Sequence, residues 1–231
     1  MIKLQRDLVE QIYDILRERI INLKMKPGVR VNIQALTEEF EVSPTPIKDT
    51  LKKLSQRGLI TNRAGTGYYV VNPSPNKVSE IYDLRKLFES YALETAIQST
   101  STKKLGEFKK EMEKLRKEID EDKKHIECYR IDQALHSEIM INSNNQMLRD
   151  FYNQIYDFVK ISQHFYRTTE EILEEHIAIV KAMLEKNLTK AKKVLEDHID
   201  HAKNRTIKAM EKKDSVWEEG SVVVSEKEKS Q

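Results

Sequence analysis

The sequence of 231 residues contains a single cysteine, Cys128, and so has no internal disulfide. This excludes a disulfide-stabilised secreted fold, and we expect a reduced, cytoplasmic protein. No stretch approaches roughly 18 uninterrupted apolar residues, which excludes a transmembrane helix and leaves no membrane among the expected partners. The first residues also lack the apolar core of a signal peptide. Six glycines and five prolines are too few for a sandwich of many short strands, so helices should dominate.

The formal net charge is only +2, from 40 basic and 38 acidic side chains, which at first argues against a nucleic-acid partner. The charge is unevenly distributed along the sequence, because residues 1–72 carry a formal charge of +4 and the remainder carries −2. The sequence therefore permits a weakly basic module followed by an acidic one.

Residues 1–72 have the pattern of a small domain with three helices and a hairpin. We expect helices over 6–23, 33–40 and 44–57, and strands over 59–61 and 68–71. Ser43 is a suitable N-cap for the third helix, and Pro44 takes the first helical position, where a missing N–H costs nothing. Gly65 and Gly67 fit a hairpin turn between the strands. The pattern predicts a winged helix-turn-helix.

Such a module places the start of its third helix in the major groove of DNA and its wing on phosphates or the minor groove. The residues available there are Ser43, Thr45 and Lys48 on the helix and Arg63, Thr66, Gly65 and Gly67 in the wing. The alternative is a small helical domain with a solvated basic face. The order of elements favours DNA binding.

A second, all-helical domain follows. Pro73 and Pro75 mark the boundary, and we expect a linker over 73–77. Beyond it the helical periodicity is continuous, and the expected helices cover 78–98, 103–124, 126–142, 146–166, 169–186 and 189–211. From Lys212 the composition turns to Lys, Glu and Ser without a helical pattern, so a disordered tail is expected over 212–231. The fold class is thus mainly α, with the helical bundle over 78–211.

Three histidines lie within apolar helical stripes, where an imidazole needs a partner. Asp132 and His136 are four residues apart and share one helix face. His176 and His198 are each 11 residues from a turn near Asn187, so they lie at the same height in a helical hairpin. If the first helix packs beside this hairpin, three nitrogens and one carboxylate converge inside a bundle, a common place for metal sites.

Three imidazoles and a carboxylate suit Zn²⁺, Ni²⁺, Co²⁺ or Mn²⁺. A single inward histidine is more often a satisfied core residue than a ligand, and the residues alone leave both interpretations open. His201, at the edge of the face of His198, is a weaker candidate, whereas His125 and His164 are expected on the surface.

Arg85 also falls on an apolar row, where an unpaired guanidinium would be costly. It could pair with a structural carboxylate, or it could bind an anionic ligand through both terminal nitrogens. Spacing alone favours the structural pair.

The motifs of both halves, in this order, resemble a known family. Residues 6–72 resemble the GntR-type winged-helix domain through Lys26-Pro27-Gly28, the run from Val42 to Leu51, and Gly65-Thr66-Gly67-Tyr68. Residues 76–211 resemble the FadR-type ligand-binding domain, called FCD, through the runs Leu84 to Glu89, Asp132 to His136, Glu175-His176 and Glu196-Asp197-His198.

The resemblance implies a homodimeric transcriptional regulator, usually a repressor, which binds a palindromic operator on double-stranded DNA and is released by a small carboxylate effector. Asp132, His136, His176 and His198 map onto the divalent-metal ligands of the metal-binding branch, and Arg85 onto an effector-binding arginine. The family commonly has arginine where Gln34, Pro44 and Lys48 stand, and the first two usually touch DNA, so the resemblance implies that Gln34 also lies at the DNA. Their replacement should lower operator affinity and its salt dependence.

A metal-dependent hydrolase or lyase is the alternative from another class, because an open position on a His/Asp site could activate water. No motif supplies a general base or a nucleophile, and an enzyme would not need a winged helix, so no catalytic residue is assigned. A regulator that senses the metal itself is a further alternative.

Overall fold

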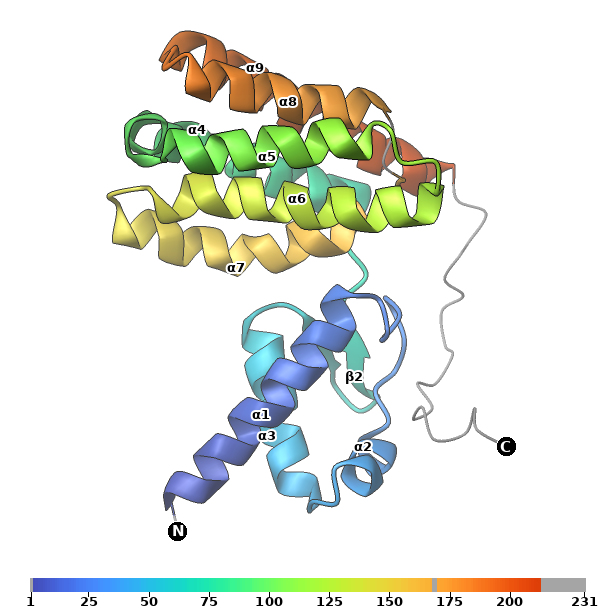
Figure 1. The fold of residues 1–231 in the computed structure, drawn as a ribbon. Helices are drawn as coiled ribbons and strands as arrows, with labels where there is room; N and C mark the ends of the chain where they lie inside the picture. The colour runs from blue at the N-terminus through green and yellow to red at the C-terminus, as the bar shows by residue number, and fades with distance from the viewer. Residues whose placement is uncertain (1, 168–169, 213–231) are drawn as a thin grey trace. The chain divides into compact units, whose positions relative to one another are not determined.

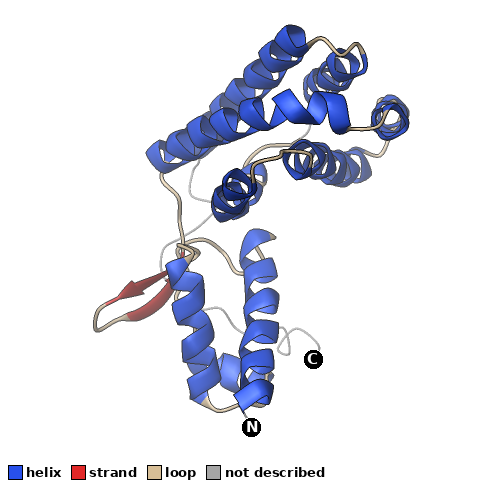
Figure 2. Ribbon diagram, turned by 90° about the vertical axis from the view of Figure 1, so that its left-hand side faces the viewer, coloured by secondary structure: helices blue, strands red, loops and turns tan. Residues whose placement is uncertain are grey.

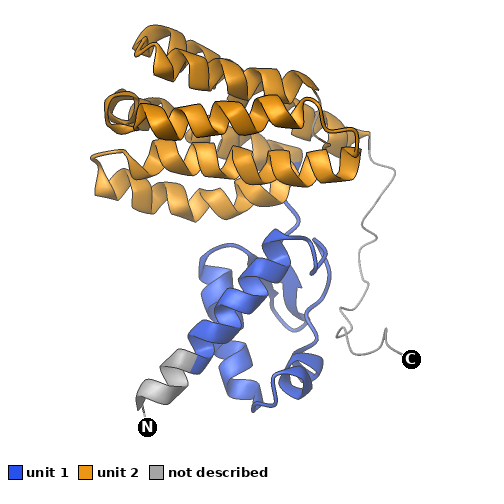
Figure 3. Cartoon of the chain, viewed as in Figure 1, with its two compact units in different colours: residues 1–74, 213–231 blue, residues 75–212 orange. Residues whose placement is uncertain are grey.

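The computed structural model describes residues 2–167 and 170–212, which form two compact units (Figure 3). The first unit ends at Ser74, and the second covers Pro75–Lys212. The disordered tail expected over 212–231 lies, apart from Lys212, outside the described residues. Within the described ranges, no helix combines the length and the apolarity that crossing a membrane requires.

The first unit contains three helices and a two-stranded sheet (Figures 1 and 2). Its elements are α1 (Ile2–Ile21), α2 (Ile33–Glu39), α3 (Pro44–Gln56), β1 (Ile60–Arg63) and β2 (Gly67–Val70). The strands pair antiparallel, with Ile60 opposite Val70. Helices α1 and α3 pack together, and the side chains of Leu16, Ile47 and Leu51 are fully buried. This is the expected winged helix-turn-helix.

Helix α3 begins at two prolines. Pro44 and Pro46 occupy its first and third positions, where no intrahelical partner awaits an N–H. Ser43 is the N-cap with an extended backbone, as the sequence predicts, but its side chain makes no capping hydrogen bond. A cap oxygen bonds the N–H of the second or third helical residue, and Pro46 has none. The hydroxyl of Ser43 is therefore not committed to the cap.

The second unit is a bundle of six helices. They are α4 (Pro75–Ser99), α5 (Thr102–Leu115), α6 (Glu121–Ile141), α7 (Gln146–Gln163), α8 (Glu170–Leu184) and α9 (Leu188–Glu211). Helix α4 packs against α6, α7 and α9, while α8 packs against α5 and α9 (Figure 1). The mainly α fold with two parts of this kind agrees with the sequence prediction.

Several predicted helix boundaries are wrong; α6, for example, begins at Glu121 rather than at 126. Helix α4 begins at Pro75, inside the predicted linker 73–77, because proline is well tolerated at the first helical position. Helix α5 ends at Leu115 rather than at 124, because Asp120 starts the next helix by accepting hydrogen bonds from the N–H groups of Asp122 and Lys123.

The core of the bundle contains an unusual number of polar side chains. Buried polar residues include Arg85, Glu89, Asp132, His136, Asp157, Ser162, Gln163, His176 and His198. They come from α4, α6, α7, α8 and α9. Buried polar groups are normally hydrogen-bonded, so the partners of these residues define the candidate site.

Candidate metal centre and DNA-contacting residues

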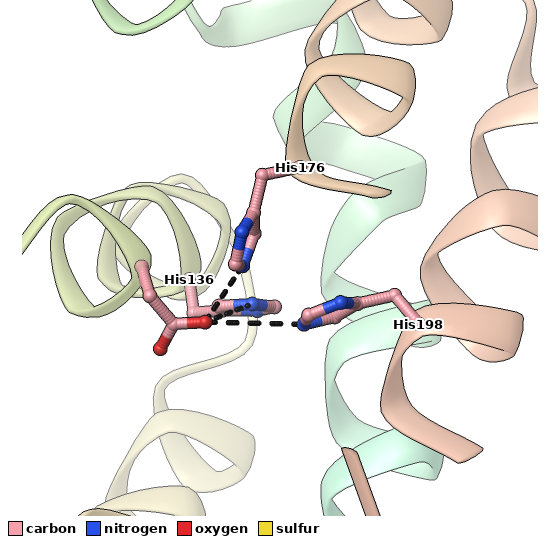
Figure 4. Close-up of side chains that lie close together, drawn as sticks. His136, His176 and His198 are labelled. Carbon is pink, nitrogen blue, oxygen red and sulfur yellow. Dashed lines mark hydrogen bonds and ion pairs between the residues drawn. The ribbon is translucent and has the colours of Figure 1, made fainter. Parts of the chain in front are cut away.

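Four side chains from three helices converge in the bundle. Asp132 and His136 come from α6, His176 from α8 and His198 from α9. Asp132 Oδ1 lies 2.7 Å from His176 Nε2, 3.5 Å from His136 Nε2 and 3.9 Å from His198 Nε2. Figure 4 shows the three imidazoles directed at one point. One ligand atom from each of the four residues lies within 4.8 Å of the others, and all four residues are buried.

The donor set fits a divalent cation. Zinc ligands lie about 2.0–2.2 Å from the ion, so neighbouring ligand atoms of a tetrahedral site lie roughly 3.3 Å apart. His136 Nε2 and His198 Nε2 are buried without a hydrogen-bond partner among the described residues. Two unpaired imidazole nitrogens facing a carboxylate in a closed core are costly unless a further group satisfies them.

A buried carboxylate, Glu89 of α4, binds the ring nitrogen of His136 that points away from the cluster. His136 Nδ1 donates to Glu89 Oε2 at 2.5 Å. Glu89 Oε1 accepts from Arg85 Nε at 2.8 Å and from the Tyr152 hydroxyl at 2.7 Å. Because a carboxylate only accepts, His136 carries a proton on Nδ1, and its Nε2 faces Asp132.

Glu175 of α8 does the same for a second imidazole. His198 Nδ1 donates to Glu175 Oε2 at 2.9 Å. Arg205 binds both oxygens of this carboxylate, at 3.0 and 2.7 Å. Each imidazole is thus held by a glutamate that an arginine holds in turn. Arg85 and Glu89 of α4 orient His136 of α6. Arg205 of α9 and Glu175 of α8 orient His198 of α9.

Metal binding requires ionised carboxylates and neutral imidazoles. Burial favours a neutral His136, but the carboxylates of Glu89 and Asp132 outweigh it and raise the pKa of this imidazole, so an ion that binds here would compete with a proton. Burial opposes ionisation of Glu89, but the charges of Arg85 and His136 outweigh it and lower the pKa of Glu89 to about 2. Burial likewise opposes ionisation of Asp132, and His136 and His176 hold its pKa well below the usual range. Burial, reinforced by His176, lowers the pKa of His198 to about 3, so this imidazole is neutral near pH 7.

Arg85 combines the two roles that the sequence leaves open. It is 1% exposed, and its Nε forms the structural pair with Glu89. Its two terminal nitrogens are buried without a hydrogen-bond partner among the described residues. These nitrogens form a fork that matches a carboxylate.

A small cavity opens beside the cluster. Its lining consists of His125, Cys128, Tyr129, Asp132, Gln163, Tyr166, Ile172 and His176. Its volume of about 20 Å³ is close to what one water molecule needs. Two of the four clustered residues, Asp132 and His176, thus line a space the size of about one water molecule.

The remaining histidines stay outside the cluster. His125 and His164 are half-buried, so each keeps part of its surface exposed, and His125 also lines the small cavity. His164 follows the last turn of α7, and its ring lies 5.0 Å from that of Tyr129. His201 is exposed and donates from Nδ1 to Glu175 Oε1 at 2.8 Å.

The predicted DNA-contacting residues of the helices are exposed. Ser43, Thr45 and Lys48 lie at the start of α3 with exposed side chains. Gln34 on α2 is exposed too, but its amide donates to Glu38 Oε1 at 3.1 Å. An acidic partner at this position disfavours a phosphate contact by Gln34.

The wing residues occupy the tip of the hairpin. The guanidinium carbon of Arg63 lies 4.2 Å from the ring centroid of Tyr69, which supports the side chain along the strand. The Thr66 hydroxyl donates to the Arg63 carbonyl at 3.2 Å and closes the turn. Gly67 has a φ of 108°, a left-handed conformation that favours glycine.

Sequence reasoning missed Glu89, Glu175 and Gln163. Glu89 follows Arg85 by four residues, and this spacing on an apolar helix signals a buried pair. Glu175 precedes His176 directly, and adjacent residues on a helix face different directions, so its contact with His198 had no local signal. Gln163 is the last residue of α7 and shares no periodic pattern.

Family models match both units. The model of bacterial regulatory proteins of the gntR family matches residues 8–70, and the FCD domain model matches residues 80–201. The HTH-type transcriptional regulator YdhC of Bacillus subtilis is 28% identical over 195 residues, covering 83% of this chain and 87% of YdhC. The HTH-type transcriptional repressor RspR of Escherichia coli is 25% identical over 169 residues, covering 73% of this chain and 60% of RspR.

Solved structures share the fold. Escherichia coli McbR/YncC superposes with a TM-score of 0.72 at 19% identity, covering 88% of this chain and 98% of that one. The Zn²⁺-bound FCD domain of TM0439 superposes with a TM-score of 0.50 at 21% identity, covering 60% of this chain and 97% of that one. At these identities the likeness establishes the common fold.

Proposed function

Since the chain belongs to the gntR family of bacterial regulatory proteins, with an FCD domain as its second half, we propose that it is a transcriptional repressor controlled by a small carboxylate at a metal centre. DNA-binding regulation follows from the family, and RspR, a repressor, supports the sign of the regulation. Because such a protein acts on the chromosome, we expect a cytoplasmic location.

The observation that carries the metal and effector part is a set of unpaired polar atoms in one core. The ion would be held by Asp132, His136, His176 and His198, and three imidazoles with one carboxylate suit Zn²⁺, Ni²⁺, Co²⁺ or Mn²⁺. The Zn²⁺-bound FCD domain of TM0439 supports zinc as the first ion to test. When bound, such an ion offers Lewis-acidic positions to the oxygens of a carboxylate.

Arg85 supplies the protein's own contact with the effector. Its two unpaired nitrogens donate to the carboxylate, while its Nε keeps Glu89 in place against His136. An effector held in this way stabilises one arrangement of α4 relative to α6, α8 and α9. The operator equilibrium shifts only by the difference in effector affinity between the two arrangements.

A homodimer on a palindromic operator completes the proposal. Large apolar side chains are exposed on neighbouring helices, Leu87 and Tyr91 on α4 and Met147 and Phe151 on α7. Tyr91 and Met147 line the same surface pocket. Exposed apolar patches of this kind mark protein–protein contacts, and twofold symmetry would place two α3 helices in successive major grooves.

The alternative of a hydrolase or lyase falls away, because the gntR model describes bacterial regulatory proteins and the relatives YdhC and RspR are transcriptional regulators. A regulator that responds to the metal alone shares the same cluster and differs only in what releases the operator. Its signature would be release at free metal concentrations near the dissociation constant, without any carboxylate.

The decisive experiment starts from an operator selected out of random DNA with the zinc-loaded full chain. Operator affinity is then measured with and without carboxylates, for the natural protein and for the His176→Ala/His198→Ala double variant. We expect release by a carboxylate in the natural protein only. A double variant that responds fully would contradict the metal-dependent mechanism, and release by Zn²⁺ alone would favour metal sensing.

A further inference from the structure

The segment that leads from α1 into α2 lies along the wing, the hairpin of β1 and β2. Val31 N–H donates to the Tyr68 carbonyl at 2.8 Å, and Arg30 forms a β-bridge with Tyr69. Val29 and Val31 are buried, whereas Arg30 between them is exposed. Successive side chains of an extended segment point to opposite sides, so Arg30 is directed away from the core, over the outer face of the wing.

The strand register places a second arginine on this face. Arg63 of β1 lies opposite Gly67 of β2. Gly67 and Tyr69 are two residues apart on one strand, so they and their partners share a face. The guanidinium carbon of Arg63 lies 4.2 Å from the ring centroid of Tyr69. A Cβ atom at Gly67 would lie 3.5 Å from Arg30 Nε, so the guanidinium of Arg30 lies against the bare backbone of this glycine.

Neither guanidinium has a carboxylate partner. Within residues 2–167 and 170–212, no ion pair engages Arg30 or Arg63, and no hydrogen bond engages the side chain of Arg30. By contrast, Arg19 of α1 pairs with Glu39. Two positive charges on one face without a counter-charge attract a polyanion.

A groove of about 300 Å³ adjoins this face at the start of α2. Its lining consists of Arg30, Val31, Asn32, Ile33, Gly67 and Tyr68, none of them acidic. Asn32 Oδ1 accepts from the Ala35 N–H at 3.1 Å, which leaves the amide nitrogen of Asn32 to donate. The polar side chains at the groove can therefore all donate, Arg30 through a planar fork. A phosphodiester, which only accepts hydrogen bonds and carries a negative charge, suits this lining.

We propose that Arg30 is a DNA-contacting residue whose guanidinium holds a phosphate of the operator backbone in this groove. The inference rests on the proposed function and adds a contact beside the one proposed for Arg63. It also supplies a charge that α2 lacks, because Gln34 stands where the family commonly has arginine and its amide donates to Glu38. Arg30 lies four residues earlier in the chain, between α2 and the wing.

The test measures the affinity of the full chain for two duplexes of equal length, the operator selected from random DNA and an unrelated sequence. Fluorescence anisotropy at several salt concentrations gives the slope of log affinity against log salt for the natural protein and for Arg30→Gln, Arg30→Lys and Arg57→Gln. Arg57 follows the last residue of α3 and is exposed, without an ion pair in the part of the chain that the structure describes, so it serves as the matched control. Far-UV circular dichroism and thermal melting confirm that each variant is folded.

In Arg30→Gln we expect the slope to decrease by about one, and the affinity for both duplexes to fall by a similar factor, because a phosphate contact is independent of sequence. Arg30→Lys should keep most of the slope, since it retains the charge. Arg57→Gln should bind both duplexes like the natural protein.

Other outcomes separate this inference from the proposed function. An unchanged slope in Arg30→Gln would remove Arg30 from the interface, and Arg30-dependent calorimetric binding of inorganic phosphate would then assign the groove to a free anion. A loss confined to the operator would mean that Arg30 reads bases, and an equal loss in Arg57→Gln would reduce the effect to net charge. Each of these results would overturn the inference while DNA binding stands. A natural protein that binds neither duplex would overturn the proposed function as well.

Discussion

His136 Nδ1 donates to Glu89 Oε2 across 2.5 Å, and both side chains are completely buried. The contact joins α6 to α4, and the same carboxylate pairs with Arg85. We therefore expect Glu89 to orient one imidazole of the proposed metal centre and the guanidinium of the proposed effector contact at the same time.

The first prediction concerns this residue. Glu89→Gln should weaken Zn²⁺ binding about 10- to 100-fold, because the neutral amide orients His136 less firmly and makes Nε2 a poorer donor to the metal. Competition with a chromophoric chelator measures the affinity. Glu94→Gln, on the exposed side of the same helix, should bind zinc like the natural protein. Equal affinities for the two variants would refute the positioning role.

The second prediction separates two histidines of α9. His198→Ala should lose stoichiometric zinc, because it removes one of four ligand atoms from a closed site. His201→Ala should keep it, since His201 is exposed and forms its ion pair with Glu175, outside the cluster of Asp132, His136, His176 and His198. Metal analysis of the purified proteins after dialysis gives the answer. Full zinc content in His198→Ala would show that the ion is held elsewhere.

The third prediction addresses Arg85. Arg85→Lys keeps the positive charge but lacks the planar fork, so carboxylate affinity should fall about tenfold or more. Calorimetric titration of the zinc-loaded variant measures this loss, with zinc content as the control for an undisturbed cluster. If carboxylate binding is unchanged while zinc is retained, Arg85 is structural only.

The fourth prediction concerns α3. Lys48→Ala should weaken operator binding for all sequences alike and reduce the slope of log affinity against log salt by about one. Lys52 lies one turn further along α3 and pairs with Asp49, so Lys52→Ala should reduce operator affinity and the salt slope less than Lys48→Ala does. Fluorescence anisotropy between low and high salt measures both slopes. The natural protein should itself show a modest slope, given Gln34 and Pro44 at positions where the family commonly has arginine.

The fifth prediction tests the dimer. Leu87→Glu should produce monomers, because a carboxylate would be buried in the proposed interface. Ile126→Glu on α6 replaces a side chain of equal exposure, 64% for both residues, and should leave the dimer intact. Light scattering coupled to size-exclusion chromatography distinguishes the outcomes. A natural protein that is monomeric at micromolar concentration would contradict the dimer directly.

The sequence predicts those residues of the candidate metal centre whose relative positions follow from the geometry of a single helix or hairpin. The i,i+4 spacing of Asp132 and His136 and the equal distances of His176 and His198 from their turn are properties of single helices and of one hairpin. The structure brings these four residues together. The start of α3 was equally predictable, because a helix tolerates proline mainly in its first turn.

The glutamates that bind the imidazoles could not be predicted in this way. Glu89 and Glu175 reach their histidines across helix interfaces, and which faces meet depends on packing between segments far apart in the chain. The end of α5 was missed for a different reason. The polar stretch before Asp120 is compatible with helix, and only the cap geometry of α6 shows where the chain turns.

The two prolines at the start of α3 have a thermodynamic consequence for DNA binding. Their rings fix φ at helical values, so the end of the helix that we propose for the major groove is already shaped in the free protein. Little conformational entropy is then lost there when the operator binds. The heat-capacity change of association should reflect buried surface alone, without the excess that accompanies folding on contact.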